Sequence, residues 1–427
     1  MRLRPLFLAA CLALALPGLA ETLDWDACVA ETKAHNVDLV KAEANVDQSR
    51  LALIDSLSGY LPKLGLSASG SSSGPYDPQE GTFGSATGGG APAYGLGLSA
   101  SQNLFAGFST LNSAAAARAR LAEAEVGLRQ TRASVAFSLR EAFDQMLFAQ
   151  EQIGMSVDIA ARRKENVGLV SLRFEAGREN KGSLLETKAQ AAQAVYDANR
   201  ATRELKSSAF RLSQILGRLP DPALRVRGDL ESVSVPAVPD TKALAPTLPP
   251  ALKARAQVDE AKASLGGEYS GFLPSLNANA SLNRSGYSGG AWPPQSGSWS
   301  AGLSLSWNLF NGFSDSMQSA AARSRSKIAE LALEDTLRQA QIDLEQAYES
   351  LADAAESAEV RAAFLESSQT RAEIGRAQYT QGLLNFDNWN QIESNLIVAR
   401  KQGLSSRRDA VDARAGWERA LGKGFEP

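Results

Sequence analysis

The chain contains the same short motif twice, first as Asn103-Leu104-Phe105-Ala106-Gly107-Phe108 and again as Asn308-Leu309-Phe310-Asn311-Gly312-Phe313. The two motifs are 205 residues apart, and the same spacing relates Leu216-Gly217 to Leu421-Gly422. The register therefore holds without a gap over about 115 residues. Self-similarity of this length at a fixed spacing indicates two copies of one structural unit.

Upstream of these motifs the spacing changes, because Tyr60-Leu61-Pro62 matches Phe272-Leu273-Pro274 at a distance of 212 residues. One loop is therefore seven residues longer in the first copy. We predict a first structural repeat at 21–230, made of a helix, two strands, a long helix and a return helix, and a second repeat at 251–427. Prolines in the connector between them, 231–250, forbid a continuous helix there.

The N-terminus has the pattern of a secretory signal peptide, which we assign to residues 1–20. Arg2 and Arg4 form a basic region, the apolar run Leu6–Leu16 follows, and small residues precede the expected cleavage site. Cys11 gives a lipobox-like pattern, but it lies inside the apolar run, and lipid attachment stays an open alternative.

Composition argues against several classes of function. The net charge of −3 and a charged fraction of 21% do not suggest a nucleic-acid partner. His35 is the only histidine and Cys28 the only cysteine after the leader, which leaves almost nothing for a zinc cluster or a catalytic triad. The glycines Gly88–Gly90 lack a phosphate-binding pattern and read as loop. We expect neither an enzyme nor a cofactor or metal.

Four segments show the two-residue period of β-strands, with apolar side chains on one face and small, uncharged polar residues on the other. Each segment is about ten residues long, which is the pattern of a transmembrane β-barrel strand, although a soluble hairpin with one buried face looks the same. Four strands cannot close a barrel, so several chains must complete it if the sheet lies in lipid. The alternating apolar positions are Leu64, Leu66 and Ala68; Leu96, Leu98, Ala100 and Leu104; Leu276, Ala278, Ala280 and Leu282; and Leu303, Leu305, Trp307 and Leu309.

Between these strands lie helical patterns of unusual length. Ser109–Ala176 contains no proline across 68 residues and would measure roughly 100 Å as a helix. A stripe of leucine, valine and alanine at seven-residue spacing permits close helix approach in a supercoiled assembly. The flanking helices, about Trp25–Gly59 and Ser183–Gly217, are half as long, so two stacked end to end match one long helix.

Together these motifs resemble the outer membrane efflux protein (TolC-like) family over essentially the whole mature chain. The resemblance implies a mainly α fold with a membrane β-barrel part. In it, long antiparallel coiled-coil helices form a trimeric α-barrel, and four β-strands per chain contribute to a 12-stranded outer-membrane barrel. It further implies an outer-membrane protein that extends into the periplasm, and a homotrimer. The trimer would serve as the passive, gated exit duct of a tripartite efflux or type I secretion system, opened by a periplasmic adaptor joined to an inner-membrane pump.

Each long helix is expected to end in a turn, at Arg173–Gly177 and Gln378–Gly382, where a glycine suits a C′ position of positive φ. In the resembled family these turns form the periplasmic mouth and meet the adaptor. The candidate docking residues are Gly177, Arg178, Glu179, Gly382 and Leu383.

Gate residues are assigned through the resemblance, which places a tyrosine three residues before the second glycine, where Tyr379 stands. It places gate aspartates six and nine residues after that glycine, and this chain has Asn388 and Gln391 there, with Asp387 adjacent. A strong carboxylate ring is therefore not expected. The matching first-copy candidates are Ser183 and Glu186. An alternative role for Asp387 and Asn388 is to cap the return helix.

A function of a different class stays open, namely a coiled-coil structural envelope protein without a pore. The amphipathic strands favour the duct, because a fibrous spacer does not need them. A non-specific diffusion porin is opposed by the long helices. The sequence does not identify the substrate.

Overall fold

A computed structural model describes residues 22–71, 76–77, 82–83, 93–287 and 296–425. The predicted signal peptide, Cys11 and the Gly88–Gly90 segment lie outside the described residues. The chain forms two compact units. The helical unit comprises Met1–Lys41, Arg129–Leu244 and Gln341–Pro427, and the sheet unit comprises Ala42–Leu128 and Ala245–Ala340.

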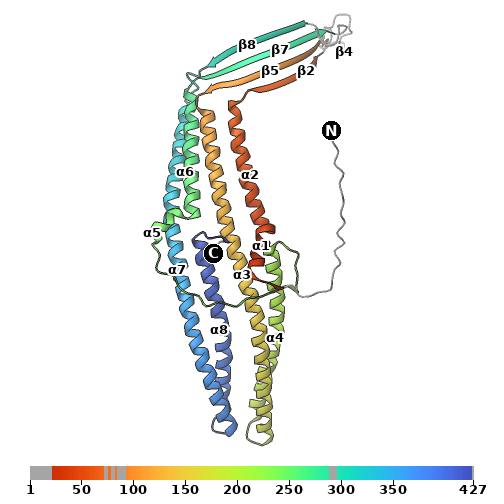
Figure 1. Cartoon of the computed structure of the whole chain (residues 1–427), viewed down its shortest axis with the longest axis vertical. Helices are drawn as coiled ribbons and strands as arrows, with labels where there is room; N and C mark the ends of the chain where they lie inside the picture. Colours follow the sequence, from red (N-terminus) through yellow and green to blue (C-terminus); the bar gives the residue numbers. More distant parts are fainter. Residues whose placement is uncertain (1–21, 72–75, 78–81, 84–92, 288–295, 426–427) are drawn as a thin grey trace. The chain divides into compact units, whose positions relative to one another are not determined.

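The sheet unit contains a four-stranded antiparallel sheet of order β2-β5-β7-β8 (Figure 1). Its outer strands β2 and β8 each have one edge that pairs with no other described strand. The pairing aligns Leu66, Leu98, Leu282 and Trp299 across the four strands, so the apolar positions share one face. The strands span Lys63–Ser71 (β2), Ala93–Ala106 (β5), Ser275–Tyr287 (β7) and Ser296–Ser306 (β8), and a separate pair joins Tyr76–Asp77 (β3) to Thr82–Phe83 (β4).

The four predicted strands are confirmed, with one difference at the last. β8 ends at Ser306, so Trp307 and Leu309, which the alternating pattern included, lie beyond it. The equivalent end of β5 stays extended because it pairs with β7 as far as Ala106, across a β-bulge.

The repeated motif makes the turn from strand to long helix. In both copies the glycine and the following phenylalanine have positive φ, at Gly107 and Phe108 and at Gly312 and Phe313. The long helices begin immediately afterwards, as α3 (Ser109–Glu175) and α7 (Ser314–Gln381). Within the sheet unit, α6 (Pro249–Glu268) is joined to the first part of α3 by ion pairs, including Arg120 Nε to Glu260 Oε1 at 2.6 Å.

The helical unit contains two antiparallel hairpins, in which α3 returns as α4 (Lys181–Leu216) and α7 returns as α8 (Phe386–Ala420) (Figure 1). Its main core is apolar and includes Cys28, Leu139, Met146, Leu212 and Leu224. A two-residue parallel pair, Thr22–Leu23 (β1) with Arg225–Val226 (β6), and the short helix Thr241–Leu244 (α5) complete it. Among the described helices, none combines the length and apolar composition that a membrane crossing requires.

The N-terminal helix is interrupted, which corrects the expectation of one helix over Trp25–Gly59. Asn36 separates α1 (Trp25–His35) from α2 (Val37–Leu57) with an extended ψ of 123°. Its side-chain oxygen accepts hydrogen bonds from the backbone N–H groups of Asp38 and Leu39, and its amide donates to the carbonyl of Ile215 at 2.9 Å. Asparagine thus caps the new helix instead of continuing the old one.

The proline-rich connector 231–250 contains some helical structure, which its prolines did not suggest. α6 begins at Pro249, inside the predicted connector, because proline is tolerated in the first turn, where its missing N–H has no intrahelical partner to lose. The boundaries of the two repeats stay predictions.

The end of α4 generates a testable prediction about backbone packing. Gly217 has a φ of +77°, and an added Cβ would lie 2.4 Å from the carbonyl oxygen of His35. Left-handed strain alone costs an alanine about 1 kcal/mol. We expect Gly217→Ala to lower the thermal unfolding midpoint by more than that strain accounts for, because the added Cβ also collides with the His35 carbonyl. The matched control is Gly177→Ala, where φ is +70° and no described atom lies within 4 Å. Equal shifts for the two variants in thermal unfolding would contradict the packing argument.

Candidate functional site at the paired helix turns

The two turns that end the long helices have the same backbone structure. Gly177 has a φ of 70° and Gly382 a φ of 80°, as predicted for glycine at C′. The next residue in each case donates its N–H to a carbonyl five residues earlier, Arg178 to Arg173 and Leu383 to Gln378. This hydrogen-bond pattern satisfies carbonyls that the helix end would leave unpaired.

Each return helix is capped by an asparagine. Asn180 accepts a hydrogen bond from the Ser183 N–H at 2.9 Å, and Asn385 accepts one from the Asn388 N–H at 3.0 Å. The alternative that Asp387 or Asn388 caps the second return helix is therefore wrong. Asp387 lies two residues after the cap, in the first turn of the helix, where its negative charge suits the helix dipole.

Next to the turns, the helices enclose a small apolar core that includes Val170, Leu184, Phe386, Tyr379 and Trp389. Tyr379 is fully buried and stacks on Trp389, with ring centroids 4.2 Å apart and planes inclined by 2°. Stacked aromatic pairs of this kind add to the stability gained from burial.

Tyr379 also ties the second hairpin to the first turn. Its hydroxyl donates to Glu179 Oε2 at 2.9 Å, and the Arg173 guanidinium lies 4.4 Å from its ring and donates to its carbonyl oxygen at 2.6 Å. Burial, together with the hydrogen bond to Glu179, raises the pKa of the phenol, so it stays a neutral donor. The two turns are therefore joined by a charge-assisted hydrogen bond.

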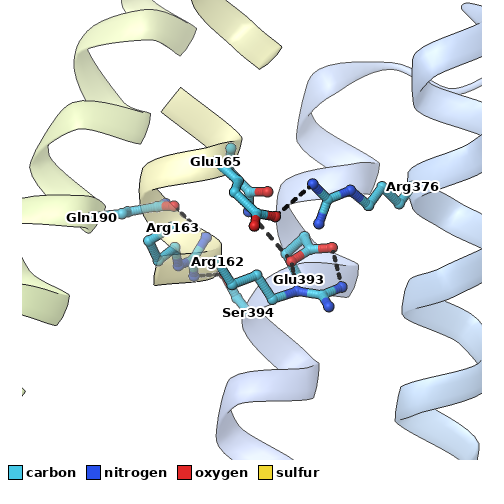
Figure 2. Close-up of polar contacts among 8 residues, drawn as sticks. Arg162, Arg163, Glu165, Gln190, Arg376, Glu393 and Ser394 are labelled. Atoms are coloured by element: carbon cyan, nitrogen blue, oxygen red, sulfur yellow. Dashed lines mark hydrogen bonds and ion pairs between the residues drawn. The ribbon is translucent and has the colours of Figure 1, made fainter. Parts of the chain in front are cut away.

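Further along the hairpins, α3 is fastened to α8 by a buried ion pair (Figure 2). Arg162 donates from Nε and Nη2 to the two carboxylate oxygens of Glu393, at 2.7 and 2.8 Å, and Glu393 is fully buried. The Asn166 amide donates to the same carboxylate at 3.3 Å. The hydrogen bond to Glu393 is the largest cause of the raised pKa of Arg162. Bidentate geometry makes this the strongest class of side-chain contact, and breaking a buried pair of this kind typically costs about 3–5 kcal/mol.

Neighbouring polar contacts extend this attachment (Figure 2). Arg163 donates to Gln190 on α4 at 2.7 Å and to Ser394 on α8 at 3.1 Å. Arg376 on α7 donates to Glu165 on α3 at 2.9 Å, in a more exposed pair that contributes less. These contacts reach all four helices.

The predicted gate residues fall into two groups in the single chain. Tyr379 and Ser183 are buried between helices. The others are exposed: Asp387, Asn388 and Gln391 on α8, and Glu186 on α4, which accepts a hydrogen bond of 2.6 Å from Asn390.

Most of the predicted docking residues are exposed at the turns: Gly177, Arg178, Gly382 and Leu383, whose side chain is 74% exposed. Glu179 is half-buried and holds Tyr379.

Sequence reasoning missed Arg162 and the role of Glu393. A signal was available, because Glu393 has the helical spacing of the buried residues Phe386, Trp389 and Leu396 and so interrupts an apolar face. The site as a whole holds two hairpins together through reversible polar contacts.

Comparison with known proteins supports a channel fold. The sequence model of the family described as "Outer membrane efflux protein" matches residues 28–218 and 248–423. No curated protein sequence matches this chain.

Solved structures of outer-membrane channels resemble the chain over most of their length. VceC of Vibrio cholerae is 19% identical, with 94% of this chain and 96% of that one covered and a TM-score of 0.81. The open state of MtrE of Neisseria gonorrhoeae is 19% identical over 93% and 89% of the two chains, with a TM-score of 0.80. CmeC of Campylobacter jejuni is 18% identical over 94% and 86%, with a TM-score of 0.79.

At such low identity the structures show the shared fold, and the family match supplies the relationship. The chain therefore belongs to the outer membrane efflux protein family and has the fold of its TolC-like outer-membrane efflux channels.

Proposed function

We propose that this chain is exported by its signal peptide at 1–20 and trimerises into a passive exit duct that carries out no chemistry of its own. In this proposal three sheets close a 12-stranded barrel in the outer membrane, and the helical hairpins line a tunnel in the periplasm. A periplasmic adaptor docks at the turns and connects the duct to an inner-membrane pump, which supplies the energy for efflux or type I secretion.

The observation that carries this proposal is the sheet β2-β5-β7-β8, which has one apolar face and, within the part of the chain that the structure describes, two unpaired edges. Its strands of 9 to 14 residues match the length that crosses a bilayer at a tilt. The exposed side chains on the apolar face include Leu66 at 81% and Trp299 at 78%. β2 and β8 run antiparallel to each other, so β8 of one copy can pair with β2 of the next in the same alternating order.

Large apolar side chains on the hairpins support an assembly of several copies. Phe364 and Ile374 on α7 are 60% and 54% exposed, and Leu185 and Tyr196 on α4 are 55% and 54% exposed. Side chains of this size tend to be covered in a helical assembly, and a neighbouring copy would cover them.

Within this assembly the candidate gate residues would act in two ways. Asp387, Asn388, Gln391 and Glu186 would line the passage from the exposed faces of α8 and α4. Tyr379 and Ser183 would hold the hairpins closed from inside. Opening would separate the α3–α4 hairpin from the α7–α8 hairpin and break the pair between Arg162 and Glu393.

The first prediction of this proposal concerns assembly. Purified full-length protein in detergent should form a heat-sensitive trimer and conduct ions across a planar bilayer. A monomer without conductance would exclude the duct and favour the structural envelope protein. Leu66→Asp would place one charge per chain, three in the trimer, on the lipid face of the barrel and should reduce membrane assembly. The matched control is Ser67→Asp, which places its charge on the opposite face and should still assemble.

The second prediction concerns closure. Glu393→Gln removes the carboxylate to which Arg162 donates two hydrogen bonds. It should increase single-channel conductance or open probability several-fold, because the two hairpins lose their buried ion pair. The matched control is Glu204→Gln, which breaks a pair with the exposed Arg200 on the same helix and should leave conductance unchanged. If Glu393→Gln yields trimers with the conductance of the wild type, the pair does not restrain opening.

The third prediction concerns docking. A photo-crosslinking amino acid at Arg178 or Leu383 should capture a periplasmic adaptor in whole cells. Placed at Asp353, an exposed residue of α7 far along the helix from its turn, the same group should not. Failure at both turns, with capture at the control position, would place the partner surface elsewhere.

A further inference from the structure

Away from the turns, α3 carries a carboxylate that the proposed duct does not use. Asp144 is fully buried beside the main core of the helical unit, among Phe143, Leu147 and their neighbours. Its Oδ2 accepts from Arg140 Nε at 2.9 Å. Its Oδ1 receives no hydrogen bond from any residue that the structure describes. A buried, ionised oxygen without a donor is costly, so this side chain needs a further partner.

A second carboxylate with an oxygen that lacks a donor, that of the half-buried Asp412, lies on α8. Its Oδ1 is also buried without a donor among the described residues, and its Oδ2 lies 3.5 Å from Arg408 Nε. Arg408 donates to Gln145 on α3 at 3.4 Å and lies 4.9 Å from the Phe148 ring, so α8 contacts α3 at this level.

The charge of Asp144 acts on Asp412. Burial is the main cause that raises the pKa of Asp144 to about 6, against the opposing effect of Arg140. Burial also raises the pKa of Asp412 to about 7, and the charge of Asp144 is the next cause. The other charged groups that face the pair are Arg414, Asp409 and Arg408 on α8, Glu141 on α3, which pairs with Arg211 of α4, and Glu231 of the connector.

We propose that Asp144 and Asp412 form a proton-binding site that fastens α3 to α8. A protonated carboxyl group is a hydrogen-bond donor, so a proton bound here supplies a donor to a site with two orphaned carboxylate oxygens. It also removes the repulsion that the charge of Asp144 exerts on the Asp412 carboxylate.

The sign of the pH dependence follows from the raised pKa values. Both acids prefer the protonated form in the folded chain more than in the unfolded chain, where their pKa is near 4. Their contribution to stability is therefore complete below about pH 4 and is lost as the pH rises through 6 and 7. The attachment of α3 to α8 thus weakens as the surrounding solution changes from mildly acidic to alkaline.

The test is the thermal unfolding midpoint of the full-length protein in detergent, measured from pH 5 to pH 8 for the wild type, the double variant Asp144→Asn/Asp412→Asn and the control Asp353→Asn. The control removes an exposed carboxylate of α7. From pH 5 to pH 8 the unfolding midpoint of the wild type and of the control should fall by several degrees more than that of the double variant. The double variant should be at least as stable as the wild type at pH 8, because asparagine keeps the shape of the protonated acid.

Infrared difference spectra provide a second measurement that does not depend on unfolding. A protonated-carboxyl band that disappears between pH 5 and pH 8 in the wild type, and is absent in the double variant, would support the site. Equal pH slopes in unfolding, or an identical band in both proteins, would overturn the proposal. If the double variant does not fold, the single variants Asp144→Asn and Asp412→Asn provide the same comparison, each removing part of the slope and of the band.

Discussion

An unpaired strand edge cannot be left in lipid, because its N–H and C=O groups have no water to bond. Among the strands that the structure describes, the sheet has two such edges, on β2 and β8, and an exposed apolar face that is costly to hydrate. Closing the sheet with further copies would pair both edges, and lipid around the closed sheet would cover its apolar face. The rest of the architecture is compatible with that closure, since the repeated Gly-Phe turns lead from the strands directly into α3 and α7.

The sequence was sufficient wherever structure is decided locally. The glycines at 177 and 382 could be assigned a positive φ because a long helix pattern ends just before each of them. The strands could be found because their period is two and their polar residues are small. Local reasoning failed at Asn36, where a tertiary hydrogen bond to Ile215 accompanies the break, and at the cap of α8, which is Asn385 and not the residues two or three positions later.

The site contacts were beyond such reasoning because they depend on the rotational phase of helices far apart in sequence. Arg162 and Glu393 are 231 residues apart, and nothing in either local pattern says that they meet. The same holds for Tyr379 and Glu179, although both were identified as residues of the turns. A charged residue at an apolar position, as at Glu393, is the one local sign that such a partner exists.

The duplication also shows where the proposed ring is weakest. A shift of 205 residues relates Arg162 to Ser367 and Glu393 to Lys188, so the repeated helices cannot form the corresponding ion pair. In a ring of three chains, α7 of one copy would lie against α4 of the next much as α3 lies against α8. The contact between α3 and α8 within each chain would then hold a buried guanidinium–carboxylate pair. The contact between α7 and α4 of neighbouring chains would instead place a serine opposite a lysine. In the proposed trimer the contacts between chains would therefore separate more easily, and full opening would require the Arg162–Glu393 pair within each chain to break.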